Sequence, residues 1–163
     1  MLRHLILICL LCCAATTTSH AQIVALGASS TAGYGVGASA SFPAQLEAIL
    51  RARGRPMSVR NAGISGDTTG GMLARLSNAV PEGTKIVILQ IAGNDAMKGM
   101  SLANAQANRA EIRKELHRRG IRTIEADGYG MAALRSGLRQ PDGIHMTAEG
   151  HRRVAEQLAA QIR

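Results

Sequence analysis

The sequence predicts an α/β protein in which helices cover both faces of a parallel sheet. Short apolar runs of strand length alternate with longer segments of helical periodicity, as in units joined by right-handed crossovers. The clearest strand is the largely β-branched run at residues 85–91, which is typical of a strand buried on both faces. Glycine-containing segments of small residues follow the first three predicted strands. Because parallel strands end at one edge of the sheet, we expect these segments to gather there.

Residues 1–21 have the pattern of a secretory signal peptide. Arg3 and His4 precede an almost wholly apolar run at residues 5–15, which is too short to span a membrane. Small residues occupy positions −3 and −1 of a cleavage site after Ala21. We therefore expect an exported protein, secreted or periplasmic, whose single domain comprises residues 22–163.

All three cysteines lie in the predicted signal peptide, at Cys9, Cys12 and Cys13. The predicted mature chain therefore has neither a disulfide nor a cysteine-based metal site. We expect no stable membrane anchor, since no later apolar run is long enough to span a bilayer.

The formal net charge of +8 comes from basic residues concentrated in helix-like stretches at residues 51–55 and 109–122. These stretches contain hardly an aromatic residue, and nucleic-acid readers usually interleave aromatics or present a recognisable module. We expect a monomer that binds no nucleic acid and has solvated basic helix faces. Attraction to anionic lipid or polymer surfaces is the alternative explanation of the charge.

In the first half of the chain, three strands are predicted to alternate with two helices. Ser41 caps the first helix and Gly54 closes it, while Pro81 stops the second. Their apolar positions are Leu46, Ile49 and Leu50 in the first helix and Met72, Leu73 and Leu76 in the second. The strands are expected to begin at Ile23, to cover residues 57–61 and to cover residues 85–91.

The second half begins with a predicted helix over residues 101–119, closed by Gly120, and a fourth strand over 121–125. A glycine-rich stretch with a short helix follows. Thr147 then caps the last helix, whose apolar stripe recurs every four residues at Val154, Leu158 and Ile162.

The segment after the first strand contains a candidate nucleophile, Ser29, two places past Gly27. A serine hydroxyl needs a neighbouring base that titrates near neutral pH, and this requirement points to histidine. His145 lies in a turn just before the last helix, with Asp142 three residues earlier, and the chain order serine, aspartate, histidine is a known triad order. The other two mature-chain histidines within helices, His117 and His151, have charged neighbours and are expected at the solvated surface.

Acyl transfer also needs donors aimed at the developing oxyanion. The candidates are the backbone N–H of Ser29, the N–H of Gly66 and the side-chain amide of Asn94, one after each of the first three strands. Met72, Met97, Met100, Met131 and Met146 are candidates for adaptable apolar lining of a substrate site, although most of them are expected to be ordinary core or surface residues.

These motifs together resemble the SGNH hydrolases, the GDSL-type esterases and lipases. Residues 27–35 are similar to the family's first block, residues 61–68 to the second, residues 93–95 to the third and residues 142–145 to the fifth. The resemblance is greatest to the small bacterial lysophospholipase and acyl-thioesterase branch.

The resemblance implies a three-layer α/β/α sandwich with a flavodoxin-like parallel sheet, and no metal or organic cofactor. It implies that Ser29 is the nucleophile, that Gly66 and Asn94 complete the oxyanion hole, and that Asp142 and His145 complete the triad. The implied substrate is a small-molecule carboxylic ester or thioester. Short-chain esters, lysophospholipids, acyl thioesters and acetylated sugars all fit this chemistry.

The chain departs from the family pattern in two places. Ala28 and Ser30 stand where the family usually has aspartate and leucine. The interval from Asn94 to Asp142 is shorter than the family norm, which predicts a sheet of four to five strands and an open or shallow acyl site.

Two alternatives to an ester hydrolase remain on the sequence alone. One is a family member that binds acyl or sugar groups without turnover, since it would share every motif. The other is a flavodoxin-like module whose glycine-rich loop binds a phosphate or nucleotide. That module leaves Asp142 and His145 unexplained, and the phosphate-loop spacings are missing. An α/β-hydrolase nucleophile elbow is disfavoured because Thr31 stands in the place of its last glycine.

Overall fold

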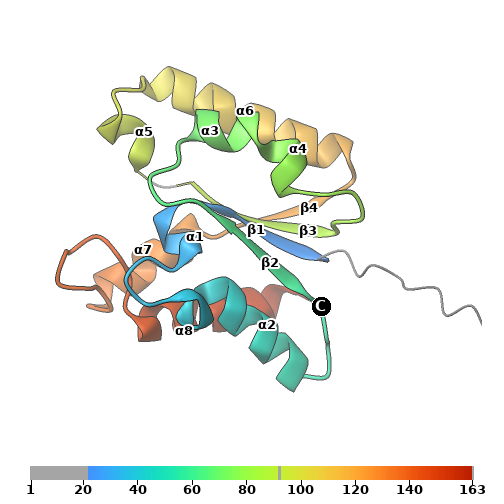
Figure 1. The fold of residues 1–163 in the computed structure, drawn as a ribbon, viewed down its shortest axis with the longest axis vertical. Helices are drawn as coiled ribbons and strands as arrows, with labels where there is room; N and C mark the ends of the chain where they lie inside the picture. The colour runs from blue at the N-terminus through green and yellow to red at the C-terminus, as the bar shows by residue number, and fades with distance from the viewer. Residues whose placement is uncertain (1–21, 92, 163) are drawn as a thin grey trace, which may run out of the picture.

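The computed structural model describes residues 22–91 and 93–162, and its centre is a four-stranded parallel sheet in the order β2-β1-β3-β4 (Figure 1). The predicted α/β class and the four-strand version of the sheet are confirmed. The predicted signal peptide and its three cysteines lie outside the described residues. The strands are β1 (Ile23–Gly27), β2 (Val59–Gly63), β3 (Ile86–Gln90) and β4 (Arg122–Glu125).

The register of the sheet aligns the carboxyl ends of β1, β2 and β3 at one level. Gly27 at the end of β1 is paired with Gly63 of β2 on one side and with Gln90 of β3 on the other. The segments that follow these strands therefore begin side by side, at the edge where ligand sites of open parallel sheets form.

Three helices cover one face of the sheet: α2 (Phe42–Ala52), α7 (Asp127–Arg135) and α8 (Ala148–Gln161) (Figure 1). Their buried apolar side chains pack on alternate residues of the strands, since successive strand residues point to opposite faces. The main members of this core are Ile23, Ala25, Ile88 and Ile124 from the strands and Leu46, Leu50, Val154 and Leu158 from the helices.

The other face is covered by α3 (Thr69–Ala74), α4 (Leu76–Ala79) and α6 (Leu102–Arg118). Its core contains Val24, Leu26, Val87 and Leu89 from the sheet and Met72, Leu76, Ile112 and Leu116 from the helices. The strands β1 and β3 are buried along their whole length, so each contributes to both cores. The resulting architecture is the expected three-layer sandwich, and no helix of the described ranges is long and apolar enough to cross a membrane.

Three short helical segments stand outside these layers. The helices α1 (Ser29–Ala32) and α5 (Asn94–Met97) begin shortly after β1 and β3 end, at the carboxyl edge of the sheet. A 3-10 turn covers Ala38–Ala40. Figure 1 shows α1, α5 and the start of α7 at the same end of the sheet.

Of the two helix caps predicted from the sequence, Thr147 is confirmed and Ser41 is not. The side chains of Ser101 and Thr147 accept hydrogen bonds from the third residue after each, as expected of N-caps. Ser41 precedes α2, but its hydroxyl instead donates to the carbonyl of Ala38 at 2.6 Å.

Two predicted elements have different bounds. The helix expected before Pro81 is divided at Arg75 into α3 and α4. The strand expected at residues 57–61 is shifted toward its carboxyl end, because β2 pairs with β1 through Gly63.

The expectation that His151 is solvated is wrong. Its side chain is fully buried between α8 and the start of α2, and its Nδ1 accepts the backbone N–H of Phe42 at 3.2 Å. The ring lies nearly parallel to that of Phe42, with 6.3 Å between centroids, and within the described residues its Nε2 has no partner. Burial lowers the pKa of His151 to about 4, so the imidazole is neutral at physiological pH.

We expect the free energy of unfolding to decrease as the pH falls from 6.5 toward about 4, because only the unfolded chain is protonated at His151 in this window. The complete window corresponds to roughly 3 kcal/mol. Urea unfolding at several pH values should give a shallower pH dependence for His151→Gln than for the native chain. The exposed His117 provides the control, since His117→Gln should keep the native dependence. Equal slopes for the native chain and His151→Gln would contradict the assignment.

Candidate active site

The carboxyl edge of the sheet holds a cavity of about 650 Å³. Ser29, Gly66 and Asn94, which follow three different strands, line it together with His145 from the turn before α8. The structure therefore brings four of the five predicted site residues to one cavity, and the fifth, Asp142, contacts His145 from behind.

Ser29, His145 and Asp142 form a continuous chain of hydrogen bonds. The Oγ of Ser29 lies 2.9 Å from Nε2 of His145, and Nδ1 of His145 lies 2.7 Å from Oδ2 of Asp142. The ring of Tyr34 also packs against the imidazole, with 4.5 Å between centroids. This arrangement leaves one imidazole nitrogen for the serine hydroxyl and commits the other to a carboxylate, as a nucleophile–base pair requires.

The turn around Asp142 also determines the charge of its carboxylate. Oδ1 accepts the backbone N–H groups of His145 and Ile144 at 3.0 and 2.9 Å. The pKa of Asp142 is lowered to about 2, first by the backbone N–H of His145, then by its imidazole and by the N–H of Ile144. Asp142 is thus ionised throughout the pH range in which a histidine base operates.

The segment that carries Ser29 is attached to both neighbouring strands through Thr31. The buried Thr31 hydroxyl donates to Oε1 of Gln90 at 2.9 Å, and Nδ2 of Asn61 donates to the Thr31 carbonyl at 2.9 Å. Gly63 permits this close approach, because a Cβ there would lie 2.3 Å from the backbone nitrogen of Ala32. Sequence analysis identified this segment but not the two polar side chains that hold it.

The candidate oxyanion donors are arranged around a turn at Gly66, whose φ of +77° favours glycine. The side-chain Nδ2 of Asn94 donates to the carbonyl of Asp67 at 2.8 Å, so the loop after β3 is joined to the loop after β2. This bond uses one of the two hydrogens of the amide, and Asn94 also lines the cavity.

Asp67 and Arg75 form a mostly buried ion pair beside these loops. The Nε of Arg75 donates to Oδ2 of Asp67 at 2.8 Å, and the two side chains are 20% and 11% exposed. The Nη2 of Arg75 also donates to the carbonyl of Gly27 at 3.2 Å, directly before the Ser29 segment. The sequence contains no local signal for this pair, because Arg75 cannot be distinguished from the other basic residues of the predicted helices.

The cavity wall is largely apolar. Met97, Met131 and Met146 line it, as expected of an adaptable substrate site, together with Leu134 and Ile144. Met72 belongs to the core, the role expected for most of these methionines.

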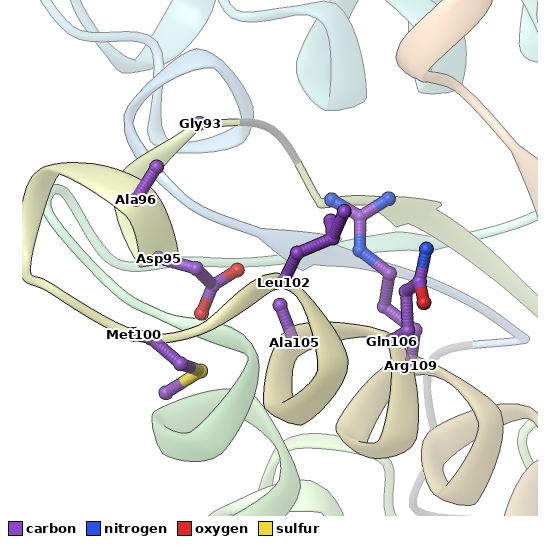
Figure 2. A pocket seen from close by; sticks show the side chains of 8 residues that line it. All are labelled: Gly93, Asp95, Ala96, Met100, Leu102, Ala105, Gln106 and Arg109. Carbon is purple, nitrogen blue, oxygen red and sulfur yellow. The ribbon is translucent and has the colours of Figure 1, made fainter.

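Met100 lines a second, smaller cavity of about 250 Å³, which shares only Gly93 with the first (Figure 2). In this cavity the carboxylate of Asp95 accepts the backbone N–H and the hydroxyl of Thr69, both at 2.9 Å. Figure 2 shows Leu102 and Arg109 projecting from α6, and Arg109 donates to the carbonyl of Ile91. The Asp95 carboxylate is therefore satisfied within the fold and does not contribute to the triad.

Asp127, at the start of α7, is a titratable group of the main cavity that sequence analysis did not single out. Burial raises its pKa, against the opposing charge of Arg109. Its Oδ1 is enclosed without a hydrogen-bond partner in the part of the chain that the structure describes. Only the tertiary structure reveals this carboxyl, because an aspartate after a strand is common at helix starts.

Comparison with known proteins gives consistent results. Residues 25–137 match the model of the GDSL-like Lipase/Acylhydrolase family. An arylesterase of Vibrio mimicus is 35% identical over 100 residues, 61% of this chain and 50% of the relative. The esterase TesA of Pseudomonas aeruginosa is 33% identical over 118 residues, 71% of this chain and 59% of the relative. The chain thus spans between half and three-fifths of the length of these two relatives.

Two solved structures illustrate the shared fold. The SGNH-hydrolase family esterase AlinE4 is 33% identical, with a TM-score of 0.59 over 86% of this chain and 70% of that chain. The psychrotrophic esterase EstA from Pseudoalteromonas has a TM-score of 0.76 over 88% of this chain and 97% of that chain. Its sequence identity is only 19%, so this similarity concerns the fold alone.

We expect Arg75→Gln to lower the free energy of unfolding by about 3 kcal/mol, because Asp67 would remain mostly buried without its partner. The matched control is Arg118→Gln, which removes an exposed pair with Glu115 and should have a much smaller effect, since solvent screens such pairs. Urea unfolding of both variants measures the difference. Equal losses would show that the Asp67–Arg75 pair does not stabilise the loops.

Proposed function

The chain belongs to the GDSL-like lipase/acylhydrolase family, and from that premise we propose that it hydrolyses carboxylic esters through an acyl-enzyme on Ser29. The observation that carries this proposal is the hydrogen-bonded chain from Ser29 through His145 to Asp142 at the cavity wall. The esterase names of the two matched relatives support the reaction class.

In the proposed mechanism, the Ser29 hydroxyl attacks the ester carbonyl while Nε2 of His145 takes its proton. The 2.9 Å separation between Oγ and Nε2 is within the reach of general-base catalysis. The imidazolium then donates this proton to the departing alcohol, and the ester bond breaks. Water, activated by the same imidazole, attacks the acyl-enzyme and releases the acid and free Ser29.

Asp142 orients and stabilises the imidazolium without taking up its proton. Its low pKa, about 2, keeps the carboxylate negative while His145 is charged. Two backbone N–H groups hold the carboxylate in place, so that the imidazole does not need to reorganise during proton transfer.

The tetrahedral oxyanion would be stabilised by the backbone N–H groups of Ser29 and Gly66 and by the amide of Asn94. All three residues line the cavity beside the nucleophile. Loss of one such donor typically removes about 3 kcal/mol of transition-state stabilisation.

The substrates we propose are small or aliphatic esters, with lysophospholipids and thioesters as related candidates. The apolar side chains of Met97, Met131 and Met146 support an aliphatic acyl group, and methionine adapts its shape to different chains. The cavity volume of about 650 Å³ is typical of small-molecule sites.

We expect Ser29→Ala to reduce kcat/KM by at least about a thousandfold on p-nitrophenyl esters ranging from acetate to palmitate. Circular dichroism should be unchanged, because Ser29 is partly exposed and, within the described residues, its side chain bonds only His145. The exposed Ser136 provides a control, and Ser136→Ala should retain native rates. If the native chain hydrolyses no ester or thioester faster than Ser29→Ala, the chain is a binding protein rather than an enzyme.

We also propose that the protein is exported and processed after Ala21, as residues 1–21 indicate. Expression of the complete chain in a Gram-negative host should yield a periplasmic or secreted product whose first residue is Gln22. Amino-terminal sequencing of that product measures the cleavage point. A cytoplasmic product that retains residues 1–21 would refute export.

A further inference from the structure

Five of the six exposed large apolar side chains of the described residues lie in segments that follow the carboxyl ends of strands, and the sixth, Ile144, lies in the turn before α8 and lines the same cavity. Their exposed fractions range from 46% for Met131 to 74% for Leu102. The complete set is Tyr34, Ile64, Met97, Leu102, Met131 and Ile144. Isolated exposed apolar residues need no explanation, but six at one edge of a domain indicate an interaction surface.

This apolar rim surrounds the mouth of the main cavity. Tyr34, Met97, Met131 and Ile144 line the cavity itself, and Ile64 directly precedes the loop that supplies Gly66. Leu102 lines the neighbouring cavity, which shares Gly93 with the first (Figure 2). The opposite edge, where the strands begin, exposes polar residues such as Arg53, Glu82 and Lys85.

The acidic and basic side chains near the apolar rim differ in whether they are engaged within the fold or exposed. Asp67, Asp95 and Asp142 bond Arg75, Thr69 and His145, and so are engaged within the fold. Asp127 also lines the cavity, but it is half-buried, and burial raises its pKa and so disfavours its charged form. Lys98 is exposed beside the mouth, and its Nζ lies 3.9 Å from the position that a Cβ on Gly66 would take. The chain as a whole carries a formal net charge of +8.

We propose that the apolar rim docks reversibly on an anionic lipid surface, which presents ester substrates directly at the cavity mouth. Apolar side chains would enter the interfacial region, while Lys98 and the net positive charge would be attracted to anionic headgroups. The role of this docking in substrate supply rests on the proposed function. The docking itself depends only on the apolar rim and its charge.

Charge complementarity favours this partner over a second copy of the chain. A two-fold interface through the apolar rim would bring together two chains of the same net charge. It would also cover the mouth of the cavity in both copies. An anionic lipid surface attracts the positive chain rather than repelling it. Contact with that surface also does not separate the cavity mouth from the substrate, because the surface is the source of the substrate.

The test uses residues 22–163, so that the apolar amino-terminal run does not contribute to lipid binding. These residues include the complete sheet and both cores. Co-sedimentation compares vesicles of phosphatidylcholine with vesicles that also contain phosphatidylglycerol. We expect binding to the anionic vesicles to be about tenfold or more tighter, and to weaken as salt is added.

The variants concern residues outside the main cavity. We expect the double variant Ile64→Ser with Leu102→Ser to bind anionic vesicles about tenfold more weakly, because two exposed apolar side chains are lost. Lys98→Glu should weaken binding similarly. Lys85→Glu changes the net charge equally at the opposite edge and should leave binding near native.

Activity on a water-soluble acetate ester separates this proposal from the proposed function. The variants at Ile64, Leu102 and Lys98 should keep the native rate on that ester while they lose vesicle binding. An inactive native chain that still binds vesicles would refute the proposed function and leave docking intact.

The docking proposal is overturned if the native chain does not bind anionic vesicles, or if Lys85→Glu loses as much binding as Lys98→Glu. It is also overturned if the native chain is a dimer by sedimentation velocity and the double variant is a monomer. In that case, a second copy rather than a lipid surface covers the apolar rim.

Discussion

The ion pair between Asp67 and Arg75 is the interaction on which the geometry of this site depends. Arg75 bonds both the Asp67 carboxylate and the Gly27 carbonyl, while the Asp67 carbonyl accepts the amide of Asn94. The loops after β1, β2 and β3 are thereby joined through one pair of side chains. Parallel strands alone align only the points where such loops begin. A misplacement of about 1 Å can cost two orders of magnitude in rate, so additional bonds between the loops are needed.

The fold could be predicted from the sequence because burial leaves a strong signal. β1 and β3 are buried on both faces, and their continuous apolar runs predicted strands at nearly the observed bounds. β2 is an edge strand that is only partly buried, so its pattern is weak and its predicted bounds were displaced. At the helix break the Arg75 side chain bonds Asp67 and the Gly27 carbonyl, and local periodicity contains no signal for these contacts.

The candidate site was predictable where local sequence determines geometry. Asp142 and His145 are three residues apart in one turn, and Ser29 directly follows a strand. The supporting partners could not be found in this way. Thr31 is held by Gln90, 59 residues away, and His151 accepts a bond from Phe42, 109 residues away. In each case the residue type fits many local environments, and only the packing of distant elements selects one.

Ala28 shows how the site tolerates a departure from the family pattern. Its methyl group is 4% exposed and packs in the core formed with α3, α4 and α6. A carboxylate at that position would need its own partners, since an unpaired buried charge is costly. The Ser29 segment is instead held by Thr31, through Asn61 on one side and Gln90 on the other. The hydrogen bond from Ser29 to His145 therefore does not require an acidic residue at position 28, and the proposed chemistry is compatible with alanine there.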